Sequence, residues 1–160
     1  MKFYAGIDIH KDSFFGTVLD ESGEVVEQGN FPNTKEALQR LLFMPRKDTQ
    51  ITIEACGMWR GFYKMIKEAG YDAFLADPRK VKDIAGKKKT DRRDSRILAD
   101  LLRTGYLPIV YIPDEEIINM RNIGRHRIRL VHMRSALKCR IKWTLLRSGI
   151  KYKKTIWVSV

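Results

Sequence analysis

The sequence predicts an α/β protein in which a mixed β-sheet domain is followed by a basic helical segment. Three observations support this class. Residues 3–31 hold three strand-like runs joined by tight turns, which is typical of an antiparallel meander. Residues 34–103 alternate between helical periodicity and short apolar runs. The last 44 of the 160 residues contain 12 Lys and Arg and no Asp or Glu, whereas the part before them carries 19 residues of each sign.

Each element has its own signal. FYAGIDI (3–9) is apolar and β-branched, and the runs at 13–20 and 25–31 alternate, so all three are predicted strands. Thr34 caps a helix to about residue 42. The remaining elements are predicted in this order: a strand at 50–54, an amphipathic helix at 59–70 closed by a glycine, a strand at 71–77, and a short helix at 78–85 that opens with proline.

The C-terminal half of the chain is predicted to be mainly helical. A loop at 86–90 leads into a helix at 91–103, and residues 114–147 follow a helical pattern in which Gly124 is a possible break. We therefore expect the following division: a domain over 1–105, an extended and proline-marked linker over 106–113, a basic coiled-coil-like segment over 114–150, and a tail over 151–160.

The predicted order β-β-β-α-β-α-β-α-α is that of the ribonuclease-H-like fold. In that fold the first strand lies at the centre of the sheet, beside the fourth. Other mixed α/β sheets stay open as alternatives, because element order does not determine topology uniquely.

Four carboxylates are the candidate catalytic residues. Asp8 lies between two isoleucines inside the first strand, where a charge is costly unless it is paired or binds metal. Glu54 ends the fourth strand, at the edge where open α/β sheets place their sites. Asp91 and Asp94 are three apart and share a helix face. Taken alone, Asp91 is better explained as a helix N-cap, and Glu54 equally well as an exposed strand-end acid.

Taken together, the four acids predict a metal site. If the first and fourth strands are neighbours, the carboxylates converge, and oxygen ligands of this kind favour Mg²⁺ or Mn²⁺. Two such ions about 4 Å apart activate an attacking oxygen and stabilise a leaving one in phosphodiester chemistry. The basic residues that would hold a nucleic-acid backbone near this site are Lys11, Lys87, Lys88, Lys89, Arg92 and Arg93.

Other phosphate-binding motifs fit the sequence less well. GKKKT (86–90) resembles a Walker A loop, but Val81 stands where that loop needs glycine. GIDIHKDS is distantly similar to the phosphate loop of sugar kinases and actin-like ATPases, yet His10 and Asp12 replace the glycine and threonine they require. For His10 we expect a structural role or a phosphate contact.

The basic C-terminal segment predicts binding to a polyanion, with nucleic acid as the favoured partner. A membrane surface fits less well, because apolar and basic residues are not separated onto two faces. A solvated helix with an acidic protein partner stays open. A loose heptad thread through Ile123, Leu130 and Leu137 indicates a helix that packs on its own domain or dimerises. The expected nucleic-acid contacts are Arg125, Arg127, Arg129, Arg134, Lys138, Arg140 and Lys142.

The sequence contains no apolar run near the ~20 residues that a membrane-spanning helix needs. Its two cysteines, Cys56 and Cys139, are far apart and form no metal-binding pair, so we expect a reduced cytoplasmic chain.

Four motifs in order resemble one family. GIDIHK (6–11), EACG (54–57), KTDRRDSRILADLL (89–102) and the basic segment at 125–150 resemble the DEDD transposases of bacterial insertion sequences, the insertion sequence 110 family, and the related pilin-gene invertases. The resemblance implies a RuvC-like domain whose acidic tetrad is Asp8, Glu54, Asp91 and Asp94. It also implies metal-dependent DNA recombination, with DNA and a structured guide RNA as partners. It favours the interpretation of the heptad pattern as a contact of a homo-oligomer formed through the C-terminal helix.

Three features depart from the family pattern. Cys56 stands where the family usually has threonine, and Ser95 where it usually has alanine. Family members continue into a second domain with a nucleophilic serine, and Ser159 lacks the surrounding motif. We therefore expect a chain that stops before that domain and does not complete strand transfer alone. The alternative is a nucleic-acid-binding module without chemistry, which would not need a divalent metal.

Deletion of residues 117–160 should abolish nucleic-acid binding and leave the charge-balanced domain folded. Binding by the full chain should weaken steeply with salt, by about 0.9 log units in affinity per log unit of salt for each duplex phosphate contact. Fluorescence anisotropy with structured RNA and duplex DNA measures both effects. If a chain that ends near Asp114 binds as tightly as the full chain, the basic segment is not the binding element and an acidic protein partner should be sought.

Overall fold

The computed structural model describes residues 2–42, 48–86 and 90–152, and the predicted elements form in the predicted order. By its internal contacts the chain divides into two compact units, Met1–Ile112 and Pro113–Val160. The first unit is an α/β domain, and the second contains one long helix.

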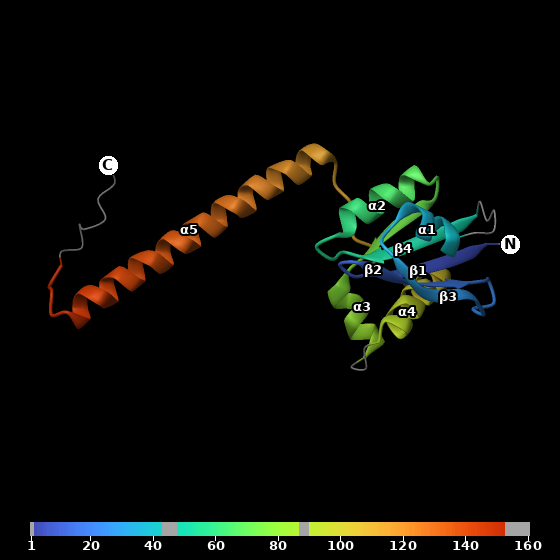
Figure 1. The fold of residues 1–160 in the computed structure, drawn as a ribbon, viewed down its shortest axis with the longest axis horizontal. Coiled ribbons are helices and arrows are strands. Elements are labelled where there is room, and N and C mark those ends of the chain that lie inside the picture. Colours follow the sequence, from blue (N-terminus) through green and yellow to red (C-terminus); the bar gives the residue numbers. More distant parts are fainter. Residues whose placement is uncertain (1, 43–47, 87–89, 153–160) are drawn as a thin grey trace. The chain divides into compact units, whose positions relative to one another are not determined.

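A five-stranded mixed sheet forms the centre of the first unit (Figure 1). Its spatial order is β3-β2-β1-β4-β5. β1 pairs antiparallel with β2 and parallel with β4, and β5 is parallel to β4. This is the ribonuclease-H-like topology that the sequence predicts, with the first strand beside the fourth. The strands are β1 (Phe3–Ile9), β2 (Ser13–Leu19), β3 (Val25–Pro32), β4 (Thr49–Glu54) and β5 (Asp72–Ala76).

Helices cover both faces of the sheet. On one face, α1 (Lys35–Leu41) and α2 (Trp59–Glu68) bury Leu38 and Ile66 against the strands. On the other face, α3 (Pro78–Ala85) and α4 (Asp91–Thr104) form a second apolar cluster. Alternation along β1 divides its side chains between these faces. Ala5, Ile7 and Ile9 are buried in the first cluster, so Gly6 and Asp8 point toward α4.

Helix α4 approaches the sheet most closely at Gly6. A Cβ atom added there would collide with the carbonyl oxygen of Ser95 and with the backbone nitrogen of Ala99, 2.5 Å away. Beside this contact, the buried hydroxyls of Thr17 and Ser95 are hydrogen-bonded at 2.7 Å, and Gln28 Nε2 donates to Thr17 Oγ1 at 2.8 Å. The hydroxyl of Ser95, the residue that departs from the family pattern, therefore has a hydrogen-bond partner on β2. Helix α4 thus contacts β1 at Gly6 and β2 at Thr17, and it accepts a hydrogen bond from Gln28 of β3 at the Arg92 carbonyl.

Part of the predicted linker belongs to the sheet. The backbone N–H of Val110 donates to Leu75, that of Asp77 donates to Pro108, and Ile109 forms an antiparallel bridge with Ala76. Without these residues, β5 would present a row of unpaired backbone groups at the sheet edge. Residues 108–110 supply hydrogen-bond partners for some of these groups. The linker prediction rested on the extended pattern and the prolines and did not include this pairing.

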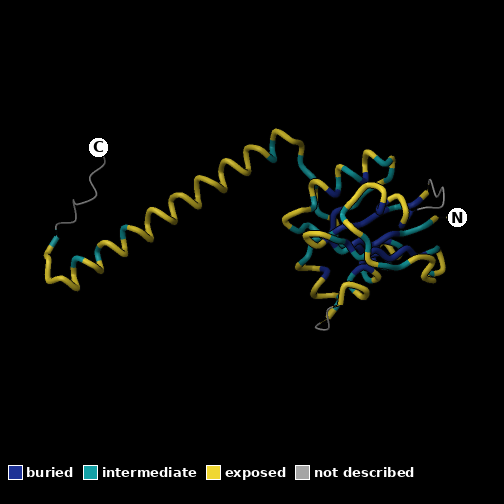
Figure 2. The backbone as a smooth tube through the Cα atoms, in the orientation of Figure 1, coloured by how far each residue is buried: buried dark blue, intermediate teal, exposed yellow. Residues whose placement is uncertain are grey.

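The second unit is dominated by α5 (Glu115–Arg147), which contains no buried residue (Figure 2). Gly124 lies within this helix without interrupting it, so the possible break predicted there is absent. A single glycine within a helix costs about 1 kcal/mol relative to alanine. A helix of 33 residues is long enough to form despite this cost. Among the described residues, none of the helices is both long and apolar enough to cross a membrane.

Substitution Gly6→Ala should destabilise the first unit by about 3 kcal/mol or more, the upper range for an overpacked core, because the added methyl group meets backbone atoms that cannot rotate away. Gly61→Ala is the matched control. Nothing lies within 4 Å of its Cβ position in α2, so it should stabilise the helix by up to about 1 kcal/mol. Urea unfolding of both variants tests this. Equal stability of Gly6→Ala and the parent chain would contradict the close approach of α4.

Candidate metal centre

The ends of two neighbouring parallel strands position the first pair of acids. In the β1–β4 ladder Gly6 is opposite Thr52 and Ile7 is opposite Ile53, so Asp8 and Glu54 follow side by side at the next position. Both side chains are half-buried and belong to the residues that alternate toward α4. The sequence expectation that these strands are neighbours is therefore correct.

The first turn of α4 carries the second pair of acids. Thr90 is the N-cap, because its hydroxyl accepts a hydrogen bond from the backbone N–H of Arg93 at 3.3 Å. Asp91 is therefore not the capping residue, so the explanation preferred for this residue when it is taken alone is wrong. Its carboxylate lies near His10 instead. Asp91 and Asp94 both lie in the first helical turn, where the partial positive charge of the helix terminus stabilises anions even without a metal.

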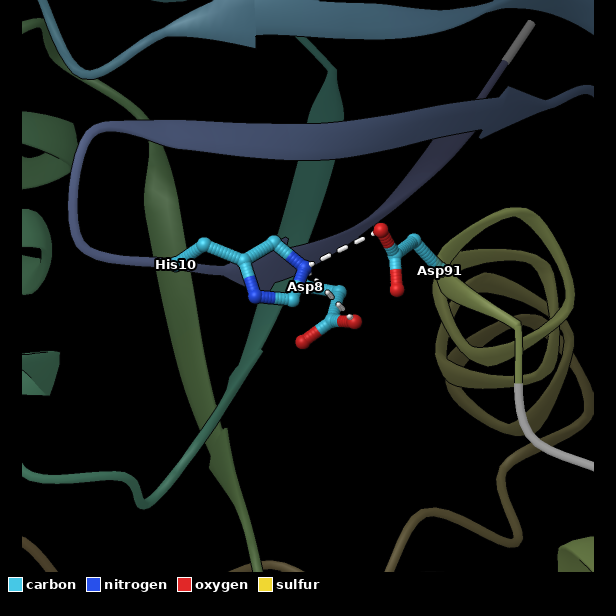
Figure 3. Close-up of side chains that lie close together, drawn as sticks. All are labelled: Asp8, His10 and Asp91. Carbon is cyan, nitrogen blue, oxygen red and sulfur yellow. Dashed lines mark ion pairs between the residues drawn. The ribbon is translucent and has the colours of Figure 1, made fainter.

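Asp8, His10 and Asp91 converge at this edge of the sheet (Figure 3). His10 Nε2 lies 3.5 Å from Asp8 Oδ2 and 3.3 Å from Asp91 Oδ2. One ligand atom from each of the three residues lies within 4.8 Å of the others. The side chain of Asp8 is 19% exposed and that of Asp91 is 59% exposed, so the cluster opens to solvent on the helix side.

The donor set fits a divalent cation. Two carboxylates and an imidazole within 4.8 Å of one another supply oxygen and nitrogen ligands that Mn²⁺ accepts, and further positions can be filled by water. Glu54 and Asp94 are not members of this compact group. They lie on the neighbouring strand end and on the same helical turn, so two of the four predicted acids form the cluster and two flank it.

The loop after β1 fixes the position of His10. Its backbone N–H donates to the Ser13 carbonyl at 2.8 Å. Asn33 donates from Nδ2 to the carbonyls of His10 at 2.7 Å and Lys11 at 3.0 Å. His10 is not among the site residues that the sequence predicts. The available signal was its closeness to Asp8, which it follows by two residues just after the strand ends.

The basic residues predicted near the acids differ in their surroundings. Lys11 and Arg92 are exposed, and Arg93 donates from Nη2 to the Ala85 carbonyl at 3.1 Å, which ties α4 to α3. Lys87, Lys88 and Lys89 lie outside the described residues. In α5, the five predicted arginine contacts are exposed and both lysines are half-buried; these residues are Arg125, Arg127, Arg129, Arg134, Lys138, Arg140 and Lys142.

A basic cavity of about 560 Å³ lies beside α4, and the sequence analysis did not predict it. Its lining includes Arg93, Arg96 and Arg103 from α4, apolar side chains at Ile84 and Ile97, and the β2–β3 turn. Asp100 pairs with Arg103 at 2.6 Å. Arg96 follows Arg93 by three residues and Arg103 follows Arg96 by seven, a spacing that would have indicated one basic face.

Comparison with known proteins links these features to one family. The family model for DEDD transposases of insertion sequence 110, described as "Transposase", matches residues 5–149. The transposase for insertion sequence element IS1111A of Coxiella burnetii is 27% identical over 150 residues, which cover 91% of this chain and 39% of that protein. The provisionally named transposase y4qE of Sinorhizobium fredii is 32% identical over 93 residues, which cover 58% of this chain and 24% of that protein.

The chain thus spans less than half the length of these two relatives. Among solved structures, T. thermophilus RuvC in complex with a Holliday junction substrate aligns with a TM-score of 0.46 at 12% identity. That alignment covers 69% of this chain and all of the RuvC chain.

Asn33→Ala should loosen the loop that carries His10. Loss of two hydrogen bonds to backbone carbonyls should cost about 1–2 kcal/mol of stability. The backbone amide of His10 should also exchange with solvent faster than in the parent chain, as measured by hydrogen–deuterium exchange. Asn30→Ala, at an exposed position on β3, is the control and should change stability by less than about 0.5 kcal/mol. Unchanged exchange at His10 in Asn33→Ala would show that the loop is held by other contacts.

Proposed function

Because the chain belongs to the DEDD transposase family of insertion sequence 110, we propose that its first unit is a metal-dependent catalytic domain that acts on phosphodiester bonds of DNA. The convergence of Asp8 and Asp91, with His10 between them, at the ends of two parallel strands carries this assignment. A half-buried carboxylate inside a strand is expensive without a cation, and the fold brings a second carboxylate to it from a helix more than eighty residues later in the chain.

In this proposal the four acids have two roles. Asp8 and Asp91 would hold a divalent ion, and Glu54 and Asp94 flank this pair from the adjacent strand and the same helical turn. A bound Mg²⁺ or Mn²⁺ would supply Lewis-acid polarisation of the scissile phosphodiester. Without a cation, the clustered carboxylates repel the phosphate of a substrate. The acids therefore make substrate binding conditional on metal.

The basic residues are proposed to hold the nucleic-acid backbone. Lys11 follows the metal cluster directly, and Arg92 lies on the exposed side of the same helical turn as the acids. Arg96 and Arg103 in the cavity beside α4 offer a second phosphate-binding path, next to apolar surface on which a base or sugar can pack. Substrate contacts on both sides of α4 would orient a strand across the metal centre.

For the second unit we propose binding to nucleic acid, including a structured guide RNA, and association with a second copy of the chain. The absence of acidic residues after Glu116 supports binding to a polyanion. Ile123, Leu130 and Leu137 are 71%, 51% and 55% exposed, so the heptad thread is available to a partner helix. The basic and the apolar side chains are not separated onto two faces of the helix, which favours binding to both nucleic acid and a second helix.

A nucleic-acid-binding module without chemistry is the second candidate. The absence of acidic residues from α5 after Glu116 favours it, since binding by that helix needs no metal. Glu54 and Asp94 also lie outside the compact ligand group. The two candidates differ in one measurable property, because only the catalytic domain requires a divalent ion at Asp8 and Asp91.

Mn²⁺ should therefore stabilise the chain against thermal unfolding, and Asp8→Asn and Asp91→Asn should each remove most of that effect. A ligand that binds only the folded state at one hundred times its Kd contributes about 2.7 kcal/mol. Asp83→Asn, at an exposed position on α3, is the control and should keep the full effect. Both site variants should also lose any metal-dependent nicking of DNA. Full metal stabilisation in Asp8→Asn and Asp91→Asn would exclude the catalytic assignment and favour the binding module.

A further inference from the structure

The imidazole of His10 lies among the predicted metal ligands, although a site made of the four acids alone would not require it. It lies in the short turn that joins β1 to β2, and its Nε2 atom is 3.5 Å and 3.3 Å from the carboxylates of Asp8 and Asp91. Its ring lies between the two acids, and its side chain is 44% exposed (Figure 3). One ring nitrogen of His10 and one oxygen from each acid lie within 4.8 Å of one another.

Two features indicate that this position is built into the fold. His10 directly follows β1 and lies two residues after Asp8, whose side chain is on the α4-facing side of that strand. Its backbone is then held at both ends, by its own N–H bond to Ser13 and by the Asn33 side chain on its carbonyl. A histidine that merely covered the acids would not need this anchoring.

We propose that His10 is a direct ligand of the divalent ion and that it shifts the preference of the site from Mg²⁺ toward Mn²⁺. Mg²⁺ favours oxygen ligands in near-ideal octahedral geometry, whereas first-row transition metals accept imidazole nitrogen as well as carboxylate oxygen. A set of two carboxylates and one imidazole therefore discriminates between Mg²⁺ and Mn²⁺ more strongly than a set of four carboxylates does. This inference rests on the proposed function, since it assigns the metal of the same site.

A phosphate contact is the other chemistry open to His10. It is disfavoured by the surroundings of Nε2, which faces two carboxylates that would repel a phosphate group. A nitrogen that faces two anions is well placed for a cation that all three groups share.

Metal titration of the full chain tests the inference. Free Mn²⁺ is followed by its electron paramagnetic resonance signal, and Mg²⁺ affinity is obtained by competition. His10→Ala and His10→Gln should each weaken Mn²⁺ binding at least about tenfold, the lower end of what even an outer-shell partner contributes, and should change Mg²⁺ binding by less than about twofold. His126→Ala, which removes an exposed histidine of α5, is the matched control and should change neither. The folded state of each variant is checked by near-ultraviolet circular dichroism.

A spectroscopic signature tests the same point without any substitution. Mn²⁺ bound to the parent chain should show electron spin-echo modulation from a directly coordinated ¹⁴N nucleus, which should disappear in His10→Gln. Absence of that coupling in the parent chain, or equal losses of Mn²⁺ and Mg²⁺ affinity in His10→Ala, would overturn the role of His10 as a selective ligand while the metal site itself stands. Retention of both metals by Asp8→Asn would instead remove the proposed function, and with it this inference.

Discussion

The close contact between Gly6 and α4 is the constraint on which the candidate metal centre depends. Because Gly6 has no side chain, the backbone of α4 at Ser95 reaches the surface of the sheet. Asp91 precedes Ser95 by one helical turn, about 6 Å along the axis, and Asp8 follows Gly6 by two residues, about 7 Å along the strand. A single glycine in β1 therefore determines how far apart two carboxylates from distant parts of the sequence come to lie.

Bringing acids together requires local compensation, and the domain provides it in two ways. Two unit charges 4 Å apart interact by about 4 kcal/mol at an effective dielectric constant of 20. Asp91 and Asp94 lie where the N-terminus of α4 presents its partial positive charge, and the imidazole of His10 lies between Asp8 and Asp91. The helix terminus supplies partial positive charge and the imidazole lies between the two carboxylates, so the cluster is compatible with a stable fold.

Sequence patterns predicted the order of the elements and the neighbouring positions of Asp8 and Glu54, because alternation, capping and strand order are local or follow from a known topology. They missed what depends on contacts distant in sequence. The anchoring of His10 by Asn33 requires a side chain from the residue that follows β3, and the pairing of residues 108–110 with β5 requires a free sheet edge. They also assigned the N-cap of α4 to Asp91 when that residue was taken alone, since Thr90 and Asp91 are both good capping residues.

The pairing of residues 108–110 with β5 also has a mechanical consequence. These residues join the sheet just before the second unit begins, so a pulling force on α5 from any bound partner reaches two backbone hydrogen bonds at the sheet edge before it reaches the buried core. The strand that takes up this load ends at Ala76, which pairs with Glu54. Tension on the basic helix is thus transmitted along the sheet edge to the strand that carries one of the four acids.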